Sequence, residues 1–488
     1  MFFRQFYHQP LAQASYLIGC QMTGDAVVID ANRDVARYIE AAAEEGLRIT
    51  HVTETHIHAD FVSGSRELAA ASGARLYLSA EGGESWQYRF ADAANATLLR
   101  DGNVIRVGNV TLTVMHTPGH TPEHLSFIVD DTPRAAGPMG IVTGDFVFVG
   151  DVGRPDLLER AAGIANTMDD AARQLFHSLA RFRNLPDHLQ VWPGHGAGSA
   201  CGKALGAVPS STVGYEKLSN WGVAETSEAQ FVSAVLDGQP EPPRYFADMK
   251  RINRDGPVVL GAMPMPKQLR ASSITDVSSS VWLIDVRRAN AFAAAHIPAS
   301  LSLPLAKSFT TWAGSLVPVD ASIVLLATTA SDAVSAARDL AMIGLDRVDG
   351  WMQIDEAIVA WRAAGRATAT MMQADALTIA ALAPTSRTLV DVRAASEWSA
   401  GHVTDALHIP LGSLATRLDE LPRGPLVLQC QGGARSAIAT SLLKRLGRHD
   451  VTNLIGGYDA WMGVTTRASN MSRTLEASAL SLNGFSSS

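Results

Sequence analysis

Apolar and polar residues follow two different rhythms along the first half of the chain. Short runs rich in β-branched residues, which are typical of buried strands, occur at 25–30, 109–116 and 140–150. Apolar side chains spaced three and four residues apart, which predict amphipathic helices, occur at 33–46 and 168–182. Strands that alternate with helices in this way indicate an α/β fold for this part of the chain.

The second half of the chain contains an internal repeat. Residues 281–305 align with residues 387–411, and residues 322–345 align with residues 425–447. The alignment places Asp285 on Asp391, His296 on His402 and Ala327 on Cys430. Each copy has the pattern of a buried strand, a loop, a helix and a turn marked by glycine. This order is expected of a parallel sheet wrapped by helices.

These patterns divide the chain into an N-terminal domain, two copies of the repeat and a tail. The N-terminal domain is expected at 1–255, and the stretch at 239–257, with its prolines among charged residues, is interpreted as a domain boundary or a connector laid over the surface. The two copies are expected at 262–365 and 372–465. The last residues, 466–488, are rich in Ser and Thr and are predicted to form a flexible tail.

The amino-acid composition indicates which classes of molecule this protein binds. Of the 488 residues, 47% are hydrophobic and 18% are charged, the formal net charge is −8, and no Lys/Arg run suggests nucleic-acid or membrane binding. No apolar run reaches the roughly 18 residues that a membrane span needs. The cysteines Cys20, Cys201 and Cys430 are too few and scattered for a disulfide framework. We therefore expect a cytoplasmic protein that acts on small molecules, and we expect it to form a homo-oligomer.

Several residues that can bind metal follow apolar strands of the N-terminal domain. They are His56, His58 and Asp60 in THIHAD, His120 in TPGHT, Asp145 in VTGDF and His195 in WPGHG. Loops at one edge of a sheet sandwich can bring such residues together around one ion. The ordered set resembles the metallo-β-lactamase superfamily over roughly the first 250 residues. This resemblance implies an αββα sandwich.

Phe61 departs from the superfamily pattern. In binuclear hydrolases of the superfamily the motif continues as H-x-H-x-D-H, and the final histidine helps to hold a second zinc ion. A phenyl ring offers no lone pair, so a single metal ion is favoured here. His58 either binds the metal or, like Asp60, only orients the ligands through hydrogen bonds, and both alternatives stay open.

The first metal position is expected to contain His56, His120 and Asp145. Two imidazoles and one carboxylate form the ligand set typical of non-haem Fe(II) oxygenases. The domain resembles the persulfide dioxygenase branch of the superfamily in THIHAD, TPGHT, TGD and GDVGRPDL. The resemblance implies that these three residues hold one Fe(II) ion per chain, with the other metal-binding residues close by; zinc is the alternative.

Two further residues of this domain are candidates for the substrate site. Arg154 can pair either with Asp156 or with an anionic substrate. Cys201 follows His195 in a glycine-rich loop, and it is either an inert buried thiol or a group that accepts or positions sulfane sulfur. Multidomain relatives carry a similar GHGAGSACGK stretch, and this resemblance favours the second interpretation.

Cys430 lies between a buried strand and a helix that is predicted to begin near Ser436. The helix dipole and the backbone N–H groups of a tight loop favour its thiolate, and Arg435 adds positive charge. The residues expected to bind substrate around it are Gln431, Gly432, Gly433, Ala434 and Ser436. Related phosphatases use a loop one residue longer, so sulfur transfer on Cys430 is favoured over phosphoryl chemistry.

The C-x4-R loop, with Asp391, Arg393 and His402 upstream of it, resembles the rhodanese family over about residues 372–465. In the earlier copy Ala327 replaces the cysteine and Asp332 replaces Arg435. That copy is therefore expected to be a rhodanese-like module without catalytic activity, serving as a spacer or in oligomerisation.

The two sites together suggest one sulfur chemistry. The whole chain resembles multidomain persulfide dioxygenase–sulfurtransferases of bacterial sulfide detoxification. The resemblance implies that a low-molecular-weight thiol persulfide is oxidised by dioxygen to sulfite, while Cys430 exchanges sulfane sulfur with sulfite and thiosulfate. One alternative is a zinc thioesterase similar to glyoxalase II, fused to a sulfurtransferase. Another is a sulfane-sulfur carrier or sensor that turns nothing over.

Overall fold

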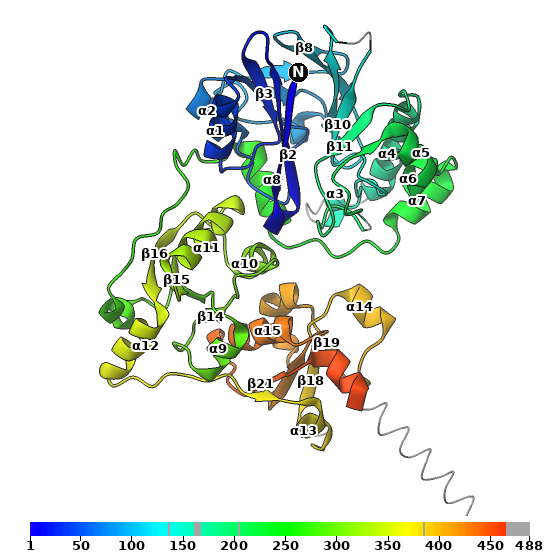
Figure 1. The fold of residues 1–488 in the computed structure, drawn as a ribbon. Helices are drawn as coiled ribbons and strands as arrows, with labels where there is room; N and C mark the ends of the chain where they lie inside the picture. The colour runs from blue at the N-terminus through cyan, green and yellow to red at the C-terminus, as the bar shows by residue number, and fades with distance from the viewer. Residues whose placement is uncertain (135–136, 161–166, 204, 384–385, 465–488) are drawn as a thin grey trace, which may run out of the picture. The chain divides into compact units, whose positions relative to one another are not determined.

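The structure is a computed structural model that describes residues 1–134, 137–160, 167–203, 205–383 and 386–464 (Figure 1). The predicted tail at 466–488 lies outside the described residues. The chain divides into two compact units. The first unit contains Met1–Met265, Ala306–Asp320 and Ala337–Asp346, and the rest of the chain forms the second. Among the described helices, none is long and apolar enough to cross a membrane.

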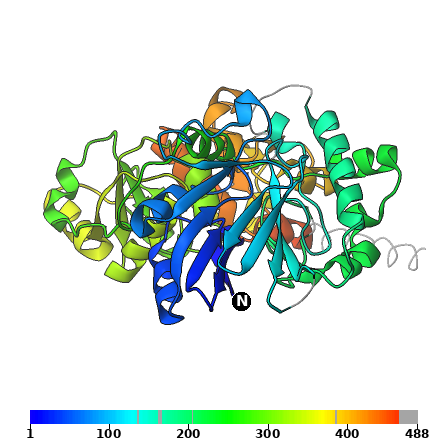
Figure 2. The same cartoon turned by 90° about the horizontal axis from the view of Figure 1, so that it is seen from above.

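Two mixed sheets form the centre of the first unit. The first sheet has the order β1-β2-β3-β4-β5-β6, with bounds Phe2–His8, Gln13–Cys20, Asp25–Ile29, Arg48–Thr53, Arg75–Ser79 and Thr97–Leu99. The second has the order β12-β11-β10-β9-β8-β7, with bounds, from β7 to β12, of Val104–Val107, Val110–His116, Leu125–Asp131, Gly140–Gly144, Gln190–Pro193 and Ser211–Thr212. Figure 2 shows the blue strands of the first sheet next to the cyan strands of the second.

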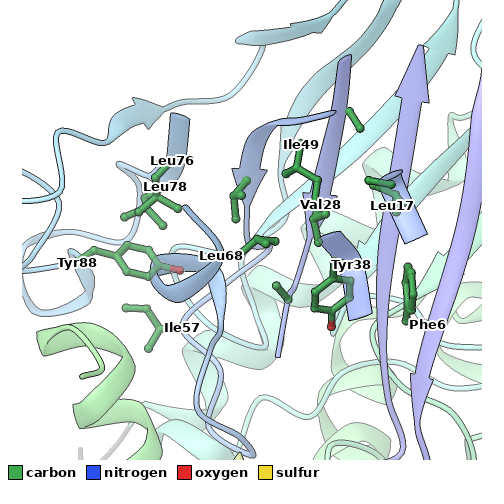
Figure 3. Packing of buried hydrophobic residues seen from close by; sticks show 14 of the residues in the cluster. Phe6, Leu17, Val28, Tyr38, Ile49, Ile57, Leu68, Leu76, Leu78 and Tyr88 are labelled. Atoms are coloured by element: carbon green, nitrogen blue, oxygen red, sulfur yellow. The ribbon is translucent and has the colours of Figure 1, made fainter. Parts of the chain in front are cut away.

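Alternating side chains explain how these sheets stack. Tyr16 and Ile18 of β2 join a buried cluster shared with the second sheet, whereas Leu17 between them faces the helices. This is the two-residue period of a strand buried on both faces. The outer face of the first sheet is covered by α1 (Ala36–Glu44) and α2 (Ser65–Ser72), and Figure 3 shows part of this core.

Helices cover the outer face of the second sheet as well. They are α4 (Met168–Arg183), α5 (Val213–Ser219), α6 (Trp221–Ala224) and α7 (Glu228–Leu236). The predicted αββα sandwich is therefore confirmed. The unit also contains α3 (Leu157–Arg160), α8 (Phe246–Asp255) and α10 (Phe309–Leu316).

The stretch at 239–257, interpreted as a domain boundary or a surface connector, contains a packed helix, so the connector alternative was wrong. Residues Phe246–Asp255 form the helix α8, which buries Phe246, Met249 and Asn253. These three residues lie at positions i, i+3 and i+7, which is the spacing of one helix face. The prolines precede the helix and follow it, so they do not interrupt this periodicity.

The second unit contains two sheets whose strands all run parallel. The first has the order β14-β13-β15-β16, with bounds, from β13 to β16, of Trp282–Asp285, Leu301–Ser302, Ile323–Ala327 and Val348–Gln353. The second has the order β17-β21-β20-β18-β19, with bounds, from β17 to β21, of Gln373–Ala374, Thr388–Asp391, Leu407–His408, Leu426–Gln429 and Val451–Leu454. The helices of the two copies are α9 (Ala289–Ala294), α11 (Ala330–Met342) and α12 (Ile354–Ala363), then α13 (Ala376–Ala380), α14 (Ala395–Ala400) and α15 (Ala434–Arg445).

The internal repeat is confirmed strand by strand. Asp285 pairs with Leu326 across β13 and β15, and Asp391 pairs with Gln429 across β18 and β20. In each copy an arginine two residues after the aspartate binds its carboxylate and donates to a backbone carbonyl eight residues further on. The predicted parallel sheets of both copies are present.

Candidate metal centre and cysteine loop

Four of the predicted metal-binding residues follow strands that end at the same edge of the sandwich. His56 follows β4, His120 follows β8, Asp145 follows β10 and His195 follows β11, and all four are buried. The Nε2 atom of His120 lies 3.5 Å from Oδ2 of Asp145, and that of His56 lies 3.9 Å from the same oxygen. The structure therefore brings His56, His120 and Asp145 together, with one ligand atom from each within 4.8 Å of the others.

The carboxylate of Asp145 indicates that these residues fit a cation. Its side chain is 0% exposed, and neither carboxylate oxygen has a hydrogen-bond partner among the described residues. A buried carboxylate without donors costs free energy unless a positive charge compensates it. A divalent ion beside His56 and His120 would supply that charge, and two imidazoles with one carboxylate suit iron or zinc.

Hydrogen bonds on the far side of each ring point the Nε2 atoms into the site. His120 Nδ1 lies 3.1 Å from the carbonyl oxygen of Arg154, and His195 Nδ1 lies 3.0 Å from that of Ala12. His56 Nδ1 lies 2.9 Å from Oγ1 of Thr55. Such contacts select one orientation of each imidazole, as outer contacts do in metalloproteins.

Two buried acids hold the backbone on either side of His56. Thr55 N donates to Oδ1 of Asp30 at 2.6 Å, and Ile57 N donates to Oε1 of Glu123 at 2.8 Å. Burial raises the pKa of Glu123 to about 7. Neither acid was predicted to belong to the site. Asp30 follows a strand and Glu123 lies near His120, but only the fold brings them to the HIH segment.

His58 is turned toward Asp30. Its Nε2 lies 3.2 Å from Oδ1 of Asp30, while its Nδ1 has no hydrogen-bond partner among the described residues. Burial lowers the pKa of His58, but the carboxylates of Asp30, Asp60 and Glu54 together outweigh that effect and raise the pKa to about 9. Nε2 thus makes an orienting contact, whereas metal binding by His58 would have to use Nδ1 after loss of a proton, and that alternative stays a prediction.

A second set of close ligand atoms lies beside the first. Asp60, His195 and Cys201 each place one ligand atom within 4.8 Å of the others, and His195 Nε2 is 3.3 Å from Oδ2 of Asp60. Cys201 thus adds a third ligand atom to this second set, which has Phe61 where binuclear enzymes have a histidine. Burial and then the nearby carboxylates of Asp145 and Asp60 raise the pKa of the Cys201 thiol well above its usual value. A thiol in this position can face a substrate sulfur or bind a second ion.

Cys430 follows β20 directly and is buried, with its Sγ in contact with the start of α15. Gly433 N donates to Sγ at 3.1 Å, and Ser436 Oγ lies 3.6 Å from it. Gly433 has φ +95°, a left-handed conformation that favours glycine. The helix begins at Ala434, two residues before the predicted start. Donors that converge on sulfur stabilise a thiolate or the terminal sulfur of a persulfide.

The remaining loop residues have different surroundings. The Gln431 side chain is held by Arg393, whose Nη1 donates to it at 3.0 Å, and by Asp459, to which it donates. Gly432 and Ala434 are exposed, so only their backbone can face a ligand bound on Cys430.

Arg435 is tied to Glu397 rather than free. Its two terminal nitrogens donate to the two carboxylate oxygens at 2.6 and 2.7 Å. These hydrogen bonds hold the pKa of Glu397 below its usual value. The hydrogen bonds to Glu397 raise the pKa of Arg435, and Cys430 adds to that effect, so the guanidinium lies near the sulfur as well as the carboxylate. That its charge assists Cys430 stays a prediction, with Glu397 offsetting part of the charge. The Arg435 guanidinium also anchors the beginning of α15 to α14.

Comparisons with known proteins agree with this geometry. Residues 8–195 match the family model described as the metallo-beta-lactamase superfamily, and residues 375–463 match the rhodanese-like domain. The crystal structure of a metallo-beta-lactamase from Staphylococcus aureus subsp. aureus COL is 41% identical, with a TM-score of 0.66, and the match covers 72% of this chain and 98% of that one. The chain belongs to the metallo-β-lactamase superfamily. It carries a rhodanese-like domain at 375–463, so the two predicted resemblances are confirmed.

Curated relatives of the metallo-β-lactamase domain have two kinds of name. A hydroxyacylglutathione hydrolase of Rhodopseudomonas palustris is 29% identical over 256 residues, which are 51% of this chain and 87% of that protein. The mitochondrial persulfide dioxygenase ETHE1 of Homo sapiens is 29% identical over 195 residues, which are 39% of this chain and 67% of that protein. The protein is thus a metal-binding enzyme of this fold joined to a rhodanese-like domain.

Arg154 serves the metallo-β-lactamase domain as a structural residue. Its guanidinium is 0% exposed and binds both carboxylate oxygens of Asp156 at 2.8 and 2.7 Å, and it also donates to the carbonyls of Ala200 and Pro240. Of the two partners that the sequence left open for Arg154, Asp156 is the one observed. Every nitrogen of the Arg154 guanidinium donates to Asp156 or to one of these carbonyls, so substrate binding by Arg154 is not the role that these contacts support. Through these contacts and its own carbonyl oxygen, Arg154 links His120 to the loop that carries Cys201.

Asn253 of α8 holds the segment of the metallo-β-lactamase domain that carries Asp60. Its Nδ2 donates to the carbonyls of His58 and Phe61, both at 2.7 Å, and its Oδ1 accepts from Ser63 N at 2.8 Å. Sequence reasoning missed Asn253 because it lies in the stretch interpreted as a domain boundary or a connector. The helical spacing of that stretch was the signal that could have revealed it.

Proposed function

We propose that the metallo-β-lactamase domain oxidises a low-molecular-weight thiol persulfide with dioxygen to sulfite, at a single iron ion held by His56, His120 and Asp145. One observation carries the proposal: a buried set of two imidazoles and one carboxylate, Asp145, that accepts no hydrogen bond from any residue in the described part of the chain. The net reaction, written for a thiol RSH, is RSSH + O2 + H2O giving RSH and sulfurous acid. The sulfane sulfur is oxidised and dioxygen is reduced.

The chain prepares this site before any substrate arrives. Bound there, ferrous iron would supply open positions for dioxygen and sulfur together with the redox chemistry. The carbonyl of Arg154 orients His120, and Thr55 orients His56. Phe61 is 0% exposed and packs against His58, with ring centroids 4.4 Å apart, so it excludes water from that side. Cys201, with its thiol held protonated, is proposed to position the persulfide sulfur.

The rhodanese-like domain is proposed to exchange the same sulfur on Cys430. The thiolate attacks the terminal sulfur of the thiol persulfide, the S–S bond breaks, and the thiol leaves as RS⁻. The new terminal sulfur would accept hydrogen bonds from Gly433 N and Ser436 Oγ. Sulfite then attacks that sulfur, which yields thiosulfate and restores the Cys430 thiolate. Thiosulfate would be the net product when both domains work.

A second candidate is a zinc thioesterase fused to a sulfurtransferase. The set of Asp60, His195 and Cys201 favours it, because it offers a second ion three ligand atoms. The hydrolase relatives agree with this candidate, while Phe61 speaks against it. A carrier or sensor without turnover is less well supported, because it would not need the complete metal-binding set of His56, His120 and Asp145.

Metal analysis of protein purified without oxygen, followed by oxygen-electrode measurements, tests the proposal. We expect close to one iron per chain and oxygen uptake with a thiol persulfide, with sulfite as product. A panel of several persulfides would identify the thiol. Two zinc ions per chain, no oxygen uptake and hydrolysis of a thioester would overturn the proposal in favour of the thioesterase.

A further inference from the structure

The copy without a catalytic cysteine contains a cavity at the place where the active copy carries its chemistry. The cavity has a volume of about 380 Å³. It is lined by Val286, Arg287, Arg288, Asn290, Ala291, Leu305, Thr328 and Asp332. Val286 follows β13 and Thr328 follows β15, so the cavity lies at the carboxyl ends of parallel strands. Parallel α/β sheets bind their ligands at this edge.

Comparison with the active copy shows how the space arises. The alignment that places Asp285 on Asp391 places Ala291 on Glu397, and the one that places Ala327 on Cys430 places Asp332 on Arg435. Glu397 and Arg435 form the ion pair that ties α14 to the cysteine loop. Both partners are replaced in the first copy, and both replacements line the cavity.

This cavity contains charged side chains of both signs, as the matching place in the second copy does, but at different positions. Arg288 lies where the active copy has Ala394, and its side chain has no ion pair or hydrogen bond with any residue in the described part of the chain. Asp332 is oriented by Thr329, whose Oγ1 donates to its Oδ2 at 2.7 Å. No ion pair within 4.0 Å joins Arg288 to Asp332 among the described residues.

Arg287 lines the same cavity, but its guanidinium is already bound within the protein and cannot bind a ligand as Arg288 can. It binds the carboxylate of Asp285 and the carbonyl of Ala295. Arg288 and Asp332 are therefore the two charges that a ligand can use. Opposite charges that share a cavity without contact gain more from a molecule that bridges them than each gains from water alone, because charge-assisted hydrogen bonds are the stronger ones.

We propose that this cavity binds a small zwitterion of the amino-acid type, with its carboxylate on Arg288 and its ammonium group on Asp332. Asn290 offers a further polar contact, and Val286, Ala291 and Leu305 provide apolar surface for a short side chain. A bare anion would meet the repulsion of Asp332, and a bare cation that of Arg288. The copy without the cysteine thus has a binding role of its own, which does not depend on the reaction proposed above.

Calorimetric titration of the full chain with S-methyl-L-cysteine tests the proposal, because this probe carries both charges and its blocked thiol cannot exchange sulfur with Cys430. We expect saturable binding with one site per chain. The N-acetyl derivative, which lacks the ammonium group, and the carboxamide, which lacks the carboxylate, should each bind about tenfold more weakly or worse.

Variants assign the two contacts. Arg288→Gln should weaken S-methylcysteine binding by about tenfold and remove its advantage over the carboxamide, while Arg288→Lys should keep most of the binding. Asp332→Asn should remove the advantage over the N-acetyl derivative. Arg270→Gln, at an exposed arginine of the same copy outside the cavity, is the matched control and should leave binding unchanged.

Three results would overturn the proposal. The first is that S-methylcysteine does not bind the native chain. The second is that the N-acetyl derivative binds as well as the zwitterion, which would indicate a simple anion site. The third is that Arg288→Gln and Asp332→Asn bind the probe as the native chain does. Because the comparison of the three probes uses the native protein, the test stands even if a variant fails to fold.

Discussion

Both terminal nitrogens of Arg435 donate to the carboxylate of Glu397, at 2.6 and 2.7 Å, so the arginine of the cysteine loop is held from outside the loop. Glu397 also accepts from Ala394 N at 3.1 Å, which closes the first turn of α14. One carboxylate therefore links the start of α14 to the start of α15. The contact thus fixes Arg435, the last residue of the loop that begins at Cys430.

Glu397→Gln should lower sulfur transfer while oxygen uptake stays unchanged. The amide keeps one contact to Arg435 but loses the charge, so we expect about a tenfold loss of transfer and a loss of about 1 kcal/mol in unfolding free energy. Sulfur-transfer and oxygen-uptake assays on the same preparation check this. Cys430→Ser is the reference, because it should abolish transfer and leave oxygen uptake intact. Equal loss of both activities in Glu397→Gln would contradict the positioning role.

The same pair predicts a dependence of stability on pH. Arg435 holds the pKa of Glu397 below its value in the unfolded chain, so the pair stabilises the folded state fully above that unfolded value, near 4.3. The stabilisation is lost as the pH falls through the lowered folded value. The difference in unfolding free energy between the native chain and Glu397→Gln should therefore shrink in acid. A difference that stays constant from pH 7 to pH 3 would show that the pair adds nothing through its charge.

Asp145→Asn should have opposite effects on the metal-free and the metal-loaded protein. Without metal, the substitution removes a buried carboxylate that has no partner among the described residues, so we expect a gain of about 1 to 3 kcal/mol in stability. With metal, it removes a ligand, so metal affinity and the stabilisation by metal should both fall. Thermal unfolding with and without metal measures both effects. Asp156→Asn is the control, because it breaks the buried pair with Arg154 and should destabilise both forms.

Asn253→Ala should weaken the metal centre without touching a metal-binding residue. It removes three hydrogen bonds that hold residues 58–63, and buried carbonyls would lose their donors, so a loss of about 2 to 4 kcal/mol is expected. Metal affinity should fall together with stability. Asn103→Ala, which removes one exposed contact to Arg100 N, is the matched control and should cost less than about 1 kcal/mol. Unchanged metal affinity in Asn253→Ala would separate α8 from the site.

Cys201→Ala decides what the second set of ligand atoms does. If one iron ion is the cofactor, metal content should stay near one ion per chain, while the persulfide KM rises because the thiol no longer positions sulfur. If Asp60, His195 and Cys201 hold a second ion, metal content should fall from two to one. Metal analysis and steady-state oxygen uptake distinguish the two outcomes. The buried thiol, with its raised pKa, should also resist alkylation at neutral pH in the native protein.

Local sequence order was enough to predict a large part of this molecule. The rhythm of apolar residues predicted α1, α4, β3 and β8 close to their observed bounds, because each is set by side chains a few positions apart. The loops after β4, β8, β10 and β11 could be predicted to meet, since strands of a sandwich end at shared edges. The repeat was visible because both copies keep the Asp-x-Arg clamp in the same register.

Contacts between distant segments could not be predicted in the same way. Nothing near Asp30, Glu123 or Asn253 in the sequence indicates that they fix the HIHAD segment, because their partners lie up to 195 residues away. The sequence likewise left Arg154 with two possible partners and gave no sign that Glu397 binds Arg435. A long arginine side chain can reach several possible partners, and the partner that it binds is decided only when the fold is packed.

The sequence by itself determined which chemical groups this protein has: two imidazoles with a carboxylate, a thiol before a helix, and a copy of the same domain without that thiol. Tertiary structure alone decided how these groups are used. It gave the Asp145 carboxylate no hydrogen-bond donor among the described residues, tied Arg435 to Glu397, and opened a charged cavity where Ala291 and Asp332 replace that pair. The physical reason is that composition and local spacing set what a residue can do, while burial and distance set which neighbour it meets.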